Sequence, residues 1–208
     1  MKKGFTLIEL LTSGLILVIA MALIAVLYGK ASKIRTIVTG ESDIQGVANQ
    51  MMDTIISGGG APLEGLRCAT RIYSNSKYPA QPNLLSTSDI TFGNVDGKLV
   101  RIKINTTAGT ETVKKGTDSS NLIDYNITDG ELEDLDFNNK IDIVNTATNN
   151  SRFCYYKADD TEITDPETDW DKIAKIMICL AAKSSLSAIS RTIILYNSVT
   201  IRNIYHID

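Results

Sequence analysis

Residues 10–29, LLTSGLILVIAMALIAVLYG, form a run of twenty residues without a charged side chain. As an α-helix this run is about 30 Å long, which matches the hydrocarbon thickness of a bilayer. Counting from Phe5 extends the apolar stretch to about 25 residues, so we expect a retained membrane-spanning helix. A cleaved secretory signal peptide is the alternative, because ALIAVLYGKA has a weak A-x-A-like spacing. Signal peptides have a shorter apolar core, however, and a helical pattern continues past this one.

The helical pattern extends from residue 30 to residue 57. Apolar side chains recur there at intervals of three and four, which predicts an amphipathic helix with one face in a core. They are Ile34, Ile37, Val38, Ile44, Val47, Ala48, Met51, Met52 and Ile55. The sequence SGGGAP at residues 57–62 is typical of a helix end. We therefore expect one helix from about Phe5 to Ile56.

Short strand-like runs follow a loop-rich stretch at residues 63–87. KLVRIKIN at residues 98–105 alternates apolar and basic side chains, which predicts a half-exposed strand. The sequence TDG at 128–130, between LIDYNI and ELEDLDF, is a hairpin signal. KIDIVN, RFCYYK, IAKIMICLAAK and SRTIILYNSVTIRN continue the series. About six or seven strands after one helix predict an α+β fold, with the long N-terminal helix packed on an antiparallel sheet.

Charge and motif content argue against several classes of function. Without Lys2, Lys3 and Glu9, the chain has 19 basic and 23 acidic side chains, and no basic cluster is longer than Lys114-Lys115. Direct nucleic-acid binding is therefore not indicated. The only histidine is His206, near the C-terminus, and G-x-S-x-G, phosphate-loop and H-E-x-x-H motifs are absent. We expect no enzymatic activity and assign no catalytic residue.

Three cysteines, Cys68, Cys154 and Cys179, lack the spacing of a zinc site. Cys154 and Cys179 both lie in strand-like stretches, so they are the preferred disulfide pair if the domain is outside the cytoplasm. The alternative is that all three are buried, free thiols.

The acidic run DDTEITDPETDWD at residues 159–171 contains seven carboxylates. Its oxygens make Asp159, Asp160, Glu162 and Asp165 weak candidates for calcium ligands. The run lacks the D-x-[DN]-x-[DN]-G spacing of an EF-hand, so a solvated loop is favoured and no cofactor is expected.

Glu9 lies at the edge of the apolar run. A carboxylate near the hydrocarbon costs a few kcal/mol and usually marks a functional contact, unless it stays hydrated at the interface. The surrounding KKGFTLIELL, residues 2–11, resembles the class III leader and N-terminal motif of type IV prepilins and type II secretion pseudopilins. Glycine-rich SGGGAP, DYNITDGELEDLDF and NSVTIRN are loosely similar to PilW-type minor pilins and J-type pseudopilins.

The resemblance implies processing by prepilin peptidase, with cleavage between Gly4 and Phe5 and N-methylation of Phe5. It also implies that Glu9 is the assembly charge, meeting the terminal amine of a neighbouring subunit, and that residues 7–26 form the helix-packing surface. The parts of the chain would be a leader (1–4), a transmembrane and assembly helix (5–29), its amphipathic continuation (30–57) and a β-rich extracytoplasmic domain (58–208). Unlike many pilins, this span has no helix-breaking proline.

The function that the resemblance implies is that of a structural subunit. It would be a minor pilin or pseudopilin of a type IV pilus (a fimbrium) or a type II secretion pseudopilus. Its partners would be other pilins through the N-terminal helix, the prepilin peptidase and the inner-membrane assembly platform. The chain would first cross the cytoplasmic (inner) membrane once, with its N-terminus in the cytoplasm, and then join a periplasmic or extracellular filament. A major pilin, and a membrane-anchored extracytoplasmic binding module that does not assemble, are the alternatives.

Overall fold

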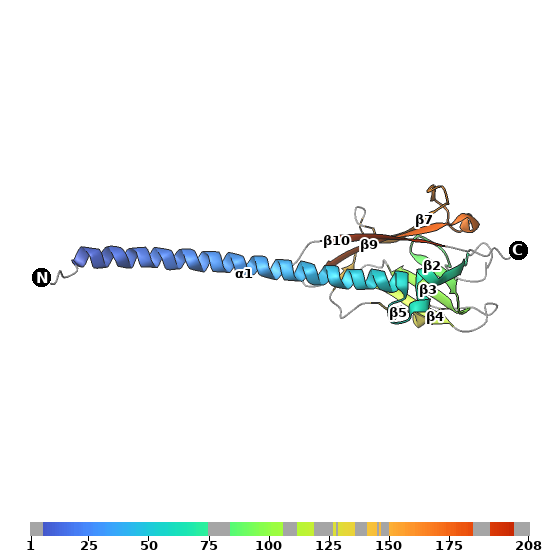
Figure 1. Cartoon of the computed structure of the whole chain (residues 1–208), viewed down its shortest axis with the longest axis horizontal. Helices are drawn as coiled ribbons and strands as arrows, with labels where there is room; N and C mark the ends of the chain where they lie inside the picture. Colours follow the sequence, from blue (N-terminus) through green and yellow to red (C-terminus); the bar gives the residue numbers. More distant parts are fainter. Residues whose placement is uncertain are drawn as a thin grey trace. The chain divides into compact units, whose positions relative to one another are not determined.

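The computed structural model describes residues 6–74, 84–105, 112–118, 127, 129–135, 141–144, 146, 150–184 and 192–201. The chain divides into two compact units, Met1–Ser42 and Asp43–Asp208, which are described separately. The longest element, helix α1, runs over Leu7–Ser57 and contributes to both units (Figure 1).

In the first unit, α1 is an exposed apolar helix. The fifteen large apolar side chains from Leu7 to Tyr28 are between 52% and 81% exposed. This helix is long and apolar enough to cross a membrane. The hydroxyl groups of Thr12 and Ser13 donate to the Glu9 carbonyl oxygen, at 3.1 and 2.7 Å, so they need no water in an apolar medium.

In the second unit, the last turns of α1 belong to the core. Ile44, Ala48, Met51, Met52, Ile55 and Ile56 are buried, and they form one cluster with side chains of two β-sheets. The expected apolar face is therefore confirmed from Ile44 onward. Ile34 and Val38, which were also expected in the core, are instead 62% and 59% exposed. They belong to the first unit, whose described residues form only this helix and have no sheet to cover them.

The glycine-rich segment after α1 ends the helix, as expected. Gly58 has φ +87°, and its N–H donates to the Thr54 carbonyl oxygen at 3.0 Å. A Cβ atom at Gly58 would lie 2.1 Å from the Ala61 carbonyl oxygen, so only glycine fits. The chain then passes through two short 3₁₀ helices, η1 (Pro62–Glu64) and η2 (Leu66–Cys68).

The first sheet is an antiparallel meander in the order β1-β2-β3-β4-β5. Its strands are β1 (Ala69–Ile72), β2 (Asp89–Asn94), β3 (Leu99–Asn105), β4 (Thr112–Asp118) and β5 (Glu133–Asp134). The face away from the main core is covered by a second apolar cluster of Tyr73, Leu84, Leu99, Ile127 and Leu132. Both faces of this sheet are thus at least partly buried.

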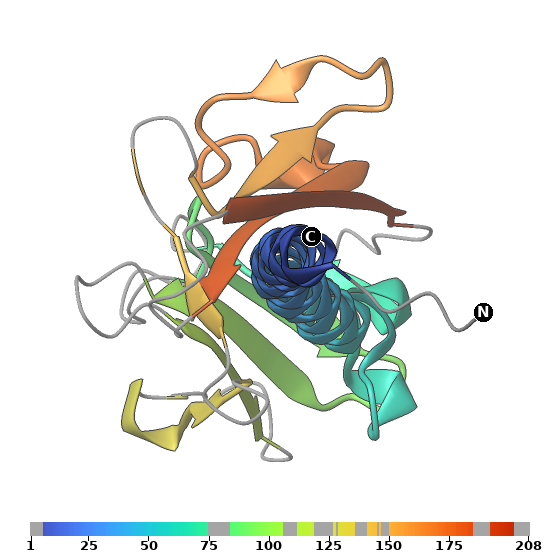
Figure 2. The same ribbon diagram turned by 90° about the vertical axis from the view of Figure 1, so that its left-hand side faces the viewer.

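The second sheet has the order β10-β9-β7-β8, with β6 also paired to β9. Its strands are β6 (Ile141–Ile143), β7 (Arg152–Tyr156), β8 (Glu162–Ile163), β9 (Lys175–Ser184) and β10 (Thr192–Thr200). Two further 3₁₀ helices lie in the connections between strands: η3 (Asp129–Glu131) precedes β5, and η4 (Trp170–Lys172) precedes β9. Figure 2 shows the green strands of the first sheet and the orange and red strands of the second as separate layers. The main core joins them, because it contains residues of both sheets.

The α+β class and the long helix packed on antiparallel β-structure are confirmed. The prediction of a single sheet is wrong, because the described strands form two sheets. Strand β1 lies in the expected loop at 63–87. Within the described part of ELEDLDF, residues 131–135, the strand β5 covers Glu133–Asp134, where it pairs with β4. Helix η3 occupies the expected hairpin turn, and residues 122–126 of LIDYNI lie outside the described residues.

Candidate functional site

The start of α1 brings Thr6 and Glu9 together. The Thr6 backbone N–H and hydroxyl both donate to Glu9 Oε2, at 2.9 and 2.8 Å. The Glu9 backbone N–H in turn donates to the Thr6 carbonyl oxygen at 3.1 Å. A glutamate three residues after the helix-capping threonine that accepts its N–H is one half of a capping box. Glu9 therefore stabilises the beginning of its own helix.

Glu9 Oε1 accepts no hydrogen bond within the described part of the chain. One oxygen of the carboxylate is thus bound locally, and the other is available to a cationic partner. The expected processing residues, Gly4 and Phe5, lie outside the described residues. The expected packing surface, residues 7–26, is the exposed apolar part of α1.

The weak calcium candidates are not brought together. Asp159 Oδ1 accepts from the Thr161 N–H at 3.0 Å, and Asp160 pairs with Lys175 at 2.8 Å. Asp165 accepts from the Thr168 hydroxyl at 2.8 Å, and Glu162 lies on β8. Among the described residues, no three His, Cys, Asp or Glu side chains form a group that could hold a metal ion. The carboxylates of Asp159 and Asp165 thus stabilise their own turns, and that of Asp160 forms an ion pair.

Cys154 and Cys179 are buried, Cys68 is half-buried, and none of the three forms a disulfide in this structure. The strand register puts Cys154 opposite Met177 and Arg152 opposite Cys179, so the two cysteines are diagonal neighbours on one face. Diagonal Cα atoms across an antiparallel pair are about 7–8 Å apart, longer than a disulfide usually spans. The predicted disulfide is therefore not formed in this structure. Burial raises the pKa of the Cys179 thiol, which favours its protonated form.

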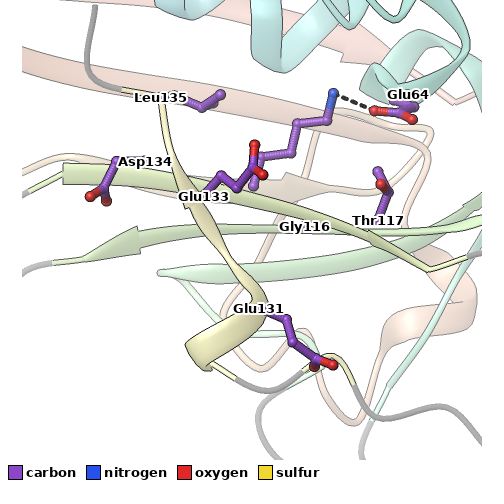
Figure 3. Close-up of a pocket in the computed structure, with 8 residues that line it drawn as sticks. Glu64, Gly116, Thr117, Glu131, Glu133, Asp134 and Leu135 are labelled. Carbon is purple, nitrogen blue, oxygen red and sulfur yellow. Dashed lines mark ion pairs between the residues drawn. The ribbon is translucent and has the colours of Figure 1, made fainter. Parts of the chain in front are cut away.

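A shallow pocket of about 270 Å³ lies beside β4 and β5 (Figure 3). Lys115 and Glu64 form an ion pair of 2.9 Å there, which joins η1 to β4. The carboxylates of Glu131, Glu133 and Asp134 also line the pocket, but Figure 3 shows them pointing in different directions. These residues therefore do not provide the convergent polar groups that most small-molecule sites contain.

A buried ion pair in the first sheet was not anticipated from the sequence. Arg101 was expected on the exposed face of its strand, but it is only 2% exposed. Its Nε donates to Asp89 Oδ1 at 2.9 Å, and another guanidinium nitrogen donates to the Ile127 carbonyl oxygen at 2.8 Å. Asp129 completes the pairing at 3.0 Å. Burial raises the pKa of Asp89, although Arg101 acts in the opposite direction.

This cluster also links the two sheets. The Tyr155 hydroxyl, on β7, donates to the Ser86 carbonyl oxygen at 2.7 Å, next to β2. Burial raises the pKa of Tyr155 well above its ordinary value, so the phenol stays protonated. Because the Tyr155 hydroxyl also lies 3.3 Å from the Asp89 carbonyl oxygen, Arg101, Asp89 and Tyr155 form a structural polar network and not a site open to a ligand.

Comparison of the chain with protein-family models, curated proteins and solved structures finds no match.

Proposed function

We propose that this chain is a structural subunit, a minor pilin or pseudopilin, of a type IV pilus or a type II secretion pseudopilus. The observation that carries the proposal is KKGFTLIELL followed directly by an uncharged, exposed helix. Cleavage between Gly4 and Phe5 would remove the basic leader and create a cationic amine at Phe5. The chain would start in the cytoplasmic membrane, with its N-terminus in the cytoplasm, and then enter a filament.

Glu9 supplies the electrostatic reason for assembly. A terminal amine and a carboxylate are both costly in hydrocarbon, and each offsets the cost of the other when they pair. Low dielectric strengthens this attraction. Because Oε2 of Glu9 is bound by Thr6, Oε1 is the atom offered to a neighbouring subunit. Apolar contacts through residues 7–26 would supply the remaining helix-to-helix packing.

The mass of the mature protein tests the processing step. We expect a chain that begins at Phe5 and carries one added methyl group at its amine. Gly4→Val should leave the leader attached, because the peptidase of this family cuts after glycine. A wild-type chain that begins at an unmethylated Met1, in cells with an active prepilin peptidase, would overturn the proposal.

Assembly is tested separately with variants of Glu9. Glu9→Ala and Glu9→Gln should be inserted and processed but absent from the sheared filament fraction. Asp43→Ala is the matched control, since it removes an exposed carboxylate of the same helix beyond the apolar run. Equal amounts of Glu9→Ala and wild-type chain in filaments would remove the assembly role of Glu9. In that case the chain would be better described as a membrane-anchored module.

A further inference from the structure

We infer that Lys30, Lys33 and Arg35, together with Tyr28, form a binding site for the headgroups of anionic phospholipids. The inference requires only that α1 crosses a bilayer, so it goes beyond the proposed function. It concerns the first turn and a half of α1 after the uncharged run, where the apolar surface gives way to three cations within six residues.

The three cations have no side-chain partner among the residues that the structure describes. Lys30, Lys33 and Arg35 are exposed, and their side chains make no hydrogen bond or ion pair in the part of the chain that the structure describes. Tyr28, five residues before Lys33, is 77% exposed. Tyrosine is enriched at membrane–water interfaces, where its ring meets lipid and its hydroxyl meets water. Aromatic and basic side chains are thus both placed where the uncharged run ends.

The rise of the helix from Lys30 to Arg35 is close to the thickness of a lipid headgroup layer. Lys30 and Arg35 are five residues apart, and so about 7.5 Å apart along the helix axis. The headgroup region on each side of a bilayer is about 5–7 Å thick. When the uncharged run fills the hydrocarbon layer, Lys30 and Lys33 lie about 1.5 and 6 Å beyond its edge along the helix axis, within the headgroup layer, and Arg35 lies about 9 Å beyond it, within side-chain reach of the phosphates. Long lysine and arginine side chains reach such phosphates easily.

The directions of the side chains favour lipid over a neighbouring helix. At about 100° per residue, Lys33 points about 60° to one side of Lys30, and Arg35 points about 140° to the other. A single neighbouring helix covers one side only, so it cannot meet all three cations. Headgroups surround a membrane helix on every side. Charge complementarity then selects anionic lipids over zwitterionic ones.

The test uses the full chain in phosphatidylcholine vesicles that contain spin-labelled phosphatidylglycerol or spin-labelled phosphatidylcholine. We expect the wild-type chain to associate severalfold more with phosphatidylglycerol. The preference should fall to near one in the triple variant Lys30→Gln, Lys33→Gln, Arg35→Gln, and it should weaken in 0.5 M salt. The charge-preserving variant Lys30→Arg, Lys33→Arg, Arg35→Lys should retain it.

A matched control removes three charges from the second unit with Arg67→Gln, Lys98→Gln and Lys183→Gln, and it should leave the lipid preference unchanged. Equal preference in wild type and in the Lys30, Lys33, Arg35 triple variant would overturn the inference. So would a wild-type chain without preference whose assembly is lost in the triple variant, because the cations would then bind a protein neighbour. An unprocessed chain that keeps the lipid preference would refute only the pilin proposal.

Discussion

Thr6 and Glu9 are joined through a single carboxylate oxygen, which accepts both the N–H and the hydroxyl of Thr6. The residue that we propose as an assembly charge is thus also a helix cap. The two roles are compatible because they use different oxygens.

Replacing Thr6 should loosen the start of α1. Thr6→Ala removes the hydroxyl donor, and loss of a capping residue costs about 1 kcal/mol. We expect the amides of the first helical turn to exchange about fivefold faster in hydrogen-exchange measurements on the chain in detergent. Thr6→Ser keeps the hydroxyl and should behave like wild type. Unchanged exchange in Thr6→Ala would show that the hydroxyl is dispensable to the cap.

The glycines after α1 provide a matched pair of variants. Gly58→Ala places a Cβ 2.1 Å from a carbonyl oxygen at φ +87°, whereas Gly60→Ala meets nothing within 4 Å. We expect Gly58→Ala to lower the free energy of unfolding by more than about 1 kcal/mol. Gly60→Ala should change it by less than about 0.5 kcal/mol. Urea unfolding followed by Trp170 fluorescence measures both, and equal effects would contradict the close approach at Gly58.

The buried pair of Arg101 and Asp89 predicts a large single-variant effect. Arg101→Met leaves a buried carboxylate without its partner, which costs about 3–5 kcal/mol. The double variant Arg101→Met, Asp89→Leu should recover much of that loss. Lys172→Met, which breaks an exposed ion pair with Asp169, should cost less than about 1 kcal/mol. Additive losses in the double variant would mean that the two buried charges are not coupled.

Tyr155 predicts how stability changes in alkaline solution. Its folded-state pKa is raised well above 10.0, so the folded chain keeps a proton that the unfolded chain loses near pH 10. Its contribution to the free energy of unfolding is complete below pH 10 and declines as the pH rises further. Tyr155→Phe should be about 1 kcal/mol less stable at pH 8 and should show a weaker decline between pH 10 and 11. Parallel declines in the two proteins would assign the effect to other tyrosines.

The thiols can be counted by alkylation. We expect native chain in iodoacetamide to react first at Cys68, because Cys154 and Cys179 are buried and burial raises the pKa of Cys179. Denaturation without a reducing agent should then expose three alkylatable thiols. Recovery of only one would show that Cys154 and Cys179 are bridged, which would require the strands carrying them to change register.

The parts of the fold that repeat a local pattern could be predicted, and the parts that depend on distant contacts could not. Helix α1 and its end at Gly58 follow from spacing and glycine. Strand β3 follows from the alternation of apolar and basic side chains, and β7, β9 and β10 follow from apolar or aromatic runs. Strand β1 is four residues long and includes Arg71, so its neighbours determine its structure. The division into two sheets likewise depends on pairings between residues far apart in the chain.

The candidate site likewise has features that the local sequence predicts and features that depend on distant contacts. Glu9 is identified by a charge at the edge of an apolar run, and the T-x-x-E spacing with Thr6 could have predicted its capping role. No sequence pattern predicts the burial of Arg101, because the alternation of apolar and basic residues in its strand predicts that one face is exposed. That face is covered by Ile127 and Leu132, which follow more than twenty residues later.

The fifteen exposed apolar side chains of α1 restrict the life cycle of this protein. Water is a poor medium for that surface, and only lipid tails or other apolar helices suit it. If the chain is a filament subunit, as proposed, it would have to pass directly from lipid to its neighbours, without a period as a free monomer. Growth of any filament that it joins would have to begin within the plane of the membrane, and disassembly would have to return each subunit to it.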